Sequence, residues 1–152
     1  MPVEQLDFLR YDGDMKIHFI GVGGIGISAL AKYYHAAGHA ISGSDLAQSE
    51  ITDELNVLGA DITVGRHRKT RLGPDIDRVI YTAAVSEKNP ELKAARERNI
   101  PVQSYAEALG ELTHQYKTIT ISGSHGKSTT TALAALEFLR SVSYFSVKLR
   151  GK

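Results

Sequence analysis

Cysteine is absent from the 152-residue chain. Without it the protein can form no disulfide, no thiolate metal site and no cysteine nucleophile, and it suits a reducing compartment. No apolar run approaches the roughly 20 residues that a membrane-spanning helix needs. The first residues also lack the basic start and apolar core of a secretory signal. We therefore expect a cytoplasmic protein with no membrane partner.

A large charge of one sign is also missing. The 18 lysines and arginines nearly match the 17 acidic residues, which leaves a formal net charge of +1. The basic residues are spread along the chain, so we expect no nucleic-acid partner. Apolar residues make up 42% of the chain, which permits one well-packed core, and the length suits one ordinary domain. No pattern indicates an oligomeric state.

Segments rich in β-forming residues alternate with segments of helical periodicity. Strands are predicted at residues 16–20, 40–44, 61–64, 78–81, 101–104 and 118–122. Helices are predicted at residues 25–37, 50–58, 90–99 and 105–115, with a last helix from Lys127. This alternation predicts an α/β fold, a Rossmann-like parallel sheet with helices on both faces. A truncated P-loop strand–loop–helix is predicted to follow it.

The same pattern divides the chain into parts. Residues 1–15 are predicted to be an N-terminal tail, and residues 16–115 the Rossmann-like domain. A second strand–loop–helix unit begins near residue 116, and we expect residues 116–140 to be an incomplete beginning of a nucleotide-binding domain. Residues 141–152 are predicted to be an atypical tail.

The first motif with chemical meaning is a glycine-rich loop. Gly21, Gly23 and Gly26 fit the pattern G-x-G-x-x-G between a predicted strand and a predicted helix. Such a loop brings backbone N–H groups and a helix N-terminus close to a diphosphate. Asp45 ends the next predicted strand, where a carboxylate can accept from a ribose hydroxyl. The residues indicate a nucleotide diphosphate without separating NAD from a nucleotide-sugar. The alternative is that the glycine turn serves only the packing of helix against strand. Asp45 would then be a solvated turn residue or a helix cap.

A second loop follows the predicted strand at 118–122. Its Gly-x-x-Gly-Lys-Ser form, from Gly123 to Ser128, would surround a triphosphate with backbone donors, a lysine and a hydroxyl. Ile121 stands where the general P-loop has another glycine, so only this shorter form is present. A chance Gly-Lys-Ser at a helix start is the alternative. Taken together the two loops are more informative, because a nicotinamide dehydrogenase has no use for the second and a simple P-loop ATPase none for the first.

With these two loops, the sequence resembles a known family, the Mur ligases of peptidoglycan synthesis. The resemblance runs from about residue 15 to about residue 138 and is closest to the ligases that add L-alanine. It rests on the stretches 17–26, 28–31, 43–45, 65–67, 81–85 and 123–131, whose combination is more specific than any one of them. Residues 139–152 show no pattern of the family.

The resemblance implies an ATP-dependent ligase that joins L-alanine to UDP-N-acetylmuramate, with ATP and Mg²⁺ as cofactors. By motif, the UDP-sugar would be bound by Gly21, Gly23, Gly24, Ile25, Gly26, Ser44, Asp45, His67, Thr82, Ala83 and Ala84. The ATP phosphates would be bound by Gly123, Ser124, His125, Gly126, Lys127, Ser128 and Thr129. Lys127 would act on the transferring phosphoryl group as the catalytic residue, and Ser128 would ligate Mg²⁺.

The family's further carboxylates and closing domain are absent from this sequence, and so is its L-alanine site. We therefore expect the chain alone to bind the UDP-sugar, to bind ATP weakly and to catalyse nothing. The sequence leaves three alternative interpretations open. The chain could be an NAD(P)-binding Rossmann module, a non-catalytic protein derived from a ligase, or another Mur ligase, including one that adds a preformed peptide.

Overall fold

The computed structural model describes residues 14–116 and 118–149, which excludes most of the predicted N-terminal tail. The chain divides into two compact units, residues 1–115 and residues 116–152. In the described ranges, no helix combines the length and the apolar character needed to cross a membrane.

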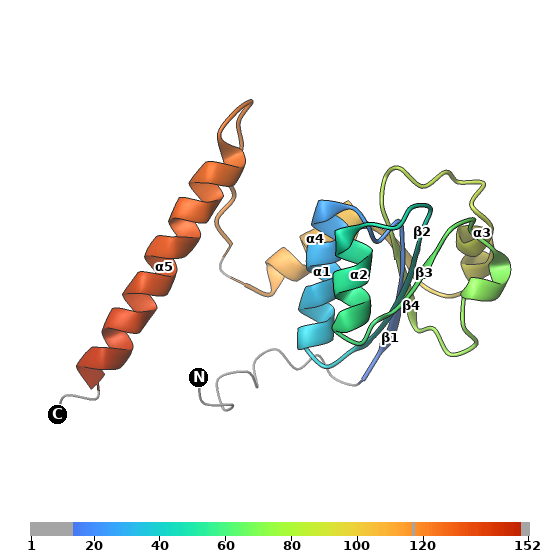
Figure 1. Cartoon of the computed structure of the whole chain (residues 1–152), viewed down its shortest axis with the longest axis horizontal. Helices are drawn as coiled ribbons and strands as arrows, with labels where there is room; N and C mark the ends of the chain where they lie inside the picture. The colour runs from blue at the N-terminus through green and yellow to red at the C-terminus, as the bar shows by residue number, and fades with distance from the viewer. Residues whose placement is uncertain (1–13, 117, 150–152) are drawn as a thin grey trace. The chain divides into compact units, whose positions relative to one another are not determined.

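The first unit is built on a five-stranded parallel sheet (Figure 1). Its strands are β1 (Lys16–Ile20), β2 (Ala40–Asp45), β3 (Asp61–Val64), β4 (Arg78–Tyr81) and β5 (Val102–Ser104). Their order across the sheet is β3-β2-β1-β4-β5, and every neighbouring pair is parallel. The predicted α/β class and parallel sheet are therefore confirmed.

Helices cover both faces of this sheet, as the alternation predicts. On one face lie α1 (Ile25–Ala36), α2 (Glu50–Val57) and α4 (Tyr105–His114) (Figure 1). On the other lies α3 (Pro90–Glu97), next to a short 3₁₀ helix, η2 (Lys69–Arg71), which the sequence did not predict. Asn89 and Pro90 begin α3 as expected, because the Asn89 side chain accepts from the Glu91 and Leu92 amides.

Successive side chains of β1 point to opposite faces of the sheet, so β1 packs against the helices on both sides. Ile17 and Phe19 belong to the core cluster that includes residues of α1, α2 and α4. Ile20 belongs to the second cluster, with Leu92 of α3. His18, which shares a face with Ile20, therefore points toward α3 and is 1% exposed. A polar group buried there needs hydrogen-bond partners. The His18 ring has two, the Ser42 hydroxyl of β2 and the Glu91 carboxylate of α3.

Among its described residues, the second unit contains one helix, α5 (Lys127–Leu149), which begins at the predicted residue and extends past residue 140 into the segment predicted to be an atypical tail. The strand predicted at residues 118–122 is wrong, since no regular structure forms there. A strand is stabilised by hydrogen bonds to a neighbouring strand, and none of the described residues supplies one. An apolar, β-branched stretch was therefore insufficient to make a strand.

Candidate functional site

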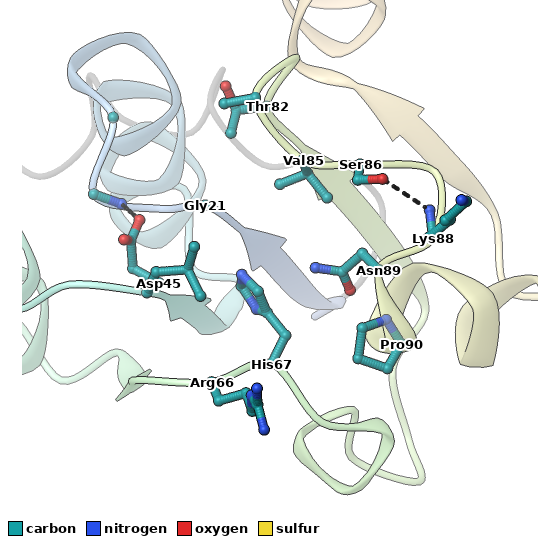
Figure 2. Close-up of a pocket in the computed structure, with 14 residues that line it drawn as sticks. Gly21, Asp45, Arg66, His67, Thr82, Val85, Ser86, Lys88, Asn89 and Pro90 are labelled. Atoms are coloured by element: carbon teal, nitrogen blue, oxygen red, sulfur yellow. Dashed lines mark hydrogen bonds between the residues drawn. The ribbon is translucent and has the colours of Figure 1, made fainter.

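A cavity of about 770 Å³ opens at the carboxyl ends of the strands (Figure 2). It lies where the strand order reverses, since β1 is flanked by β2 on one side and by β4 on the other. Ligands of open α/β sheets bind at such a switch point. The cavity is lined by Gly21, Gly23, Gly24, Asp45, Leu46, Arg66, His67, Thr82, Ala84, Val85, Ser86, Lys88, Asn89 and Pro90.

The glycine loop forms one wall and is tied to the rest of the sheet. The amides of Gly21 and Val22 both donate to the Ser44 carbonyl, at 2.8 and 3.2 Å, and the Gly24 amide donates to the Gly21 carbonyl at 3.3 Å. The helix that follows, α1, has no side-chain N-cap. The amides of its first turn are therefore left to bind an anion, which the helix dipole favours.

Asp45 crosses from the end of β2 to this loop. One carboxylate oxygen accepts from the Gly23 amide at 2.8 Å, and the other accepts from the Ala47 amide at 3.1 Å (Figure 2 draws the first). A negative charge at Gly23 repels a phosphate group placed against that amide. The N-terminal end of α1, where its N-cap residue Gly24 lines the cavity, is thus the favourable position for a diphosphate. Each oxygen of Asp45 keeps a second acceptor position for a hydroxyl.

Positively charged side chains line the cavity from both sides of β1. Arg66 and His67 follow β3, and Lys88 comes from the segment between β4 and α3 (Figure 2). In residues 14–116 and 118–149, neither the Arg66 guanidinium nor the Lys88 ammonium has a hydrogen-bond or ion-pair partner. An acidic ligand would supply one. Sequence reasoning named His67 alone, although Arg66 lies in the same short motif; Lys88 had no motif to reveal it.

The predicted sugar-binding residues fall into two groups. Those that line the cavity are Gly21, Gly23, Gly24, Asp45, His67, Thr82 and Ala84. Those that do not are Ile25, Gly26, Ser44 and Ala83. The Ile25 side chain is 84% exposed, and Gly26 lies against the Tyr105 ring of α4. Ser44 is fully buried, because its position in β2 directs it toward α3, beneath the cavity floor.

A buried carboxylate organises that floor. Glu91, in the first turn of α3, is 0% exposed and is surrounded by polar groups from three other segments. Its Oε2 lies 2.5 Å from the Ser44 hydroxyl and 3.1 Å from His18 Nε2. Its Oε1 lies 3.1 Å from His67 Nδ1 and 3.2 Å from the Arg68 amide. Sequence reasoning missed Glu91, because an acidic residue in a first helical turn is ordinarily a response to the helix dipole.

These contacts decide the charge of Glu91. Burial by itself would raise its pKa. Hydrogen bonds from His18 and Ser44, with the charges of His18 and His67, outweigh burial and lower the pKa from 4.5 to about 2. Glu91 is therefore ionised at neutral pH and acts as an acceptor in all its contacts.

The second loop, residues 123–129, is exposed throughout. The Lys127 ammonium donates to the Gly123 carbonyl at 2.5 Å and approaches the Ser124 carbonyl at 3.4 Å. Lysine and backbone donors suited to a triphosphate are thus present. Over the described ranges, however, no group of three or more His, Asp or Glu could hold a metal ion. Ser128 consequently lacks the carboxylates that usually share Mg²⁺ with it, and the residues present fit the phosphates better than the metal.

Comparison with known proteins gives a consistent result. Residues 16–117 match the model of the Mur ligase family, catalytic domain. A UDP-N-acetylmuramate–L-alanine ligase of Clostridium botulinum (strain Eklund 17B / Type B) is 46% identical over 129 residues, which cover 84% of this chain and 27% of that protein. The ligase of the same name from Campylobacter jejuni is 46% identical over 120 residues, covering 79% and 27%. The chain thus spans about a quarter of the length of these curated relatives.

Solved structures agree. The crystal structure of UDP-N-acetylmuramate-alanine ligase from Thermotoga maritima superposes with a TM-score of 0.76 at 37% identity, covering 83% of this chain and 30% of that one. A UDP-N-acetylmuramate:L-alanyl-γ-D-glutamyl-meso-diaminopimelate ligase from Neisseria meningitides gives 0.70 at 26% identity, covering 78% and 37%.

Proposed function

The chain belongs to the Mur ligase family, and from that membership we propose that its first unit binds UDP-N-acetylmuramate for a ligase that joins L-alanine to this sugar. The names of the relatives that are 46% identical support L-alanine as the second substrate. A ligase that adds a preformed peptide is less well supported, at 26% identity. The absence of cysteine suits a cytoplasmic setting.

The observation that carries the proposal is the chemistry of the cavity walls. The uncapped N-terminus of α1 follows β1, and Arg66 and Lys88 line the cavity from the segments after β3 and β4, without partners among the described residues. A diphosphate between them would be bound by backbone amides and by cationic side chains. The volume of about 770 Å³ falls within the range of small-molecule sites.

The second loop would bind the phosphates of ATP in the whole ligase. Bound there, ATP would supply the phosphoryl group that activates the sugar's carboxylate, with release of ADP, so that the amine of L-alanine could form the amide bond and displace inorganic phosphate. In this scheme the backbone of residues 123–129 would hold the phosphates, and Lys127 would leave its loop carbonyls to neutralise the transferring group. Ser128 would contribute its hydroxyl to Mg²⁺, together with carboxylates from elsewhere in the enzyme.

Calorimetric titration of the 152-residue chain tests the proposal, with UDP-N-acetylmuramate and NAD⁺ as parallel ligands. We expect binding of the UDP-sugar and none of NAD⁺. Arg66→Ala and Lys88→Ala should each weaken binding by about tenfold or more, the usual effect of losing a charged hydrogen bond. Lys93→Ala, an exposed change on α3 outside the cavity lining, is the matched control and should leave affinity unchanged.

Two results would contradict the proposal. Binding of NAD⁺ alone would make the cavity a dinucleotide site with Asp45 as its ribose acceptor. Binding of the UDP-sugar with unchanged affinity in both the Arg66 and the Lys88 variant would show that neither cationic side chain contacts the ligand.

A further inference from the structure

We propose that Glu91 is a positioning residue for the sugar-nucleotide site, which holds the His67 imidazole so that Nε2 is left for the ligand. This inference rests on the proposed function, because it concerns the same cavity. Glu91 does not line the cavity, whereas His67 does. Any effect of Glu91 on the ligand must therefore pass through another side chain.

The arrangement around Glu91 uses its full accepting capacity. An ionised carboxylate offers about four acceptor positions and no donor. Here four donors meet it: the His67 ring and the Arg68 amide at Oε1, and the Ser44 hydroxyl and the His18 ring at Oε2. They come from β1, β2 and the segment after β3, so the carboxylate joins three neighbouring parts of the sheet.

Because the carboxylate can only accept, the proton between it and His67 must lie on Nδ1 of the ring. Ser44 Oγ also lies 3.1 Å from this Nδ1, but the serine hydrogen is used by Glu91 at 2.5 Å. Ser44 therefore faces His67 as a second acceptor. Both contacts fix the same tautomer and ring orientation, and they leave Nε2 as the nitrogen that can meet the ligand.

Of the two histidines at Glu91, His67 is the one that reaches the cavity. The His67 side chain is 12% exposed and lines it, while the His18 side chain is 1% exposed and does not. Figure 2 shows the His67 ring among the labelled cavity residues. Glu91 is itself held firmly, since the Asn89 cap fixes the helix start that carries it. The network thus passes from a rigid helix end through one imidazole to the site.

The burial of the Glu91 charge indicates a role beyond stability. An ionised group inside a protein loses its hydration, and well-packed apolar residues commonly stabilise as much or more. The neighbouring Leu92 shows that α3 can bury an apolar side chain completely at this depth. A charged residue at Glu91 is best explained by what it does to His67.

The test is a double-mutant cycle with UDP-N-acetylmuramate titrated into wild type, Glu91→Gln, His67→Ala and the double variant. We expect Glu91→Gln and His67→Ala each to weaken binding about tenfold or more, the usual effect of losing a hydrogen bond to a charged group. The double variant should bind no more weakly than His67→Ala alone. Glu97→Gln makes the same chemical change on α3 at a side chain that is 62% exposed, and it should bind as wild type does.

The second readout needs neither the ligand nor a variant. Nitrogen-15 NMR of the imidazole rings reports which nitrogen carries the proton, and we expect a protonated Nδ1 at His67 in the wild-type chain. A His67 ring with hydrogen on Nε2 alone would overturn the proposal, whether or not Glu91→Gln folds.

The remaining outcomes separate the two claims. A wild-type chain that folds but does not bind the UDP-sugar would defeat the proposed function and this inference with it. In a second outcome, the wild-type chain binds normally, and Glu91→Gln lowers the affinity by the same factor in wild type and in His67→Ala. Glu91 would then have a structural role only, and the proposed function would stand.

Discussion

The two units contain the same kind of local motif, a glycine loop that opens a helix, in two very different surroundings. In the first unit the loop amides are bonded to β2, and the helix behind them packs into a buried core. In the second unit no residue from 118 to 140 is buried, and the lysine of the loop bonds to the loop's own carbonyls. A motif specifies which groups are available, and the neighbouring strands decide where those groups are held.

The largest test of this contrast compares two helical leucines. Leu92 of α3 is 0% exposed and Leu136 of α5 is 55% exposed. We expect Leu92→Ala to lower the free energy of unfolding of the first unit by about 3–5 kcal/mol, through lost burial and the cavity left behind. Leu136→Ala should change it by less than about 0.5 kcal/mol. Urea unfolding followed by circular dichroism measures both, and comparable losses would contradict the contrast.

A somewhat smaller effect is expected on the free energy of unfolding at acidic pH. The pKa of Glu91 falls from 4.5 to about 2 on folding, so between these values the unfolded chain binds more protons than the folded one. Its stabilisation is fully present above pH 4.5 and is lost as the pH falls toward 2, by on the order of 3 kcal/mol. Glu91→Gln should flatten this part of the stability profile. Glu137→Gln, a 76% exposed carboxylate of the second unit, should not alter it.

The next comparison uses one substitution in both loops. Gly21 and Gly126 have nearly the same backbone angle, φ +79° and φ +75°, so alanine is strained at either. A Cβ at Gly21 would also lie 2.4 Å from Thr82 Cγ2, whereas a Cβ at Gly126 would meet nothing within 4 Å. We expect Gly21→Ala to cost about 1–3 kcal/mol more than Gly126→Ala, the usual cost of overpacking. Equal thermal shifts would show that the first loop is as loosely held as the second.

The smallest expected effect is at Lys127. Its exposed ammonium serves only the loop carbonyls in the described structure, so Lys127→Ala should leave thermal unfolding almost unchanged. We expect Mg·ATP to bind the 152-residue chain more weakly than about 1 mM, a free energy of about −4 kcal/mol. Calorimetric binding well below 1 mM that disappears in Lys127→Ala would show that the second loop needs no surrounding sheet.

Local patterns predicted the first unit well. The strands at residues 16–20, 61–64 and 78–81 have the predicted bounds, and Asn89-Pro90 marks the start of α3. These features depend on alternation and capping, which act over a few residues. Residues 118–122 carried an alternating, β-branched pattern and formed no strand, since a strand depends on a partner elsewhere in the chain.

The candidate site was predicted in part for the same reason. The glycine loop and Asp45 follow a local motif, and the structure brings both to the cavity. Glu91 was missed, because its surroundings come from residues between 23 and 73 positions away in the sequence. Ser44 was placed correctly at the end of β2, but only the three-dimensional sheet shows that its hydroxyl turns inward to Glu91.

The uncapped first turn of α1 has a thermodynamic consequence. Helices usually satisfy these amides with a Ser, Thr, Asp or Asn side chain, whose loss costs about 0.5–2 kcal/mol. Here Gly24 holds the cap position and supplies none. An anionic ligand that binds these amides would act as the missing cap, so occupancy and folding would be linked. At a ligand concentration 100 times its Kd, the linkage would raise the free energy of unfolding by about 2.7 kcal/mol, and the protein's apparent stability would then follow the concentration of that anion.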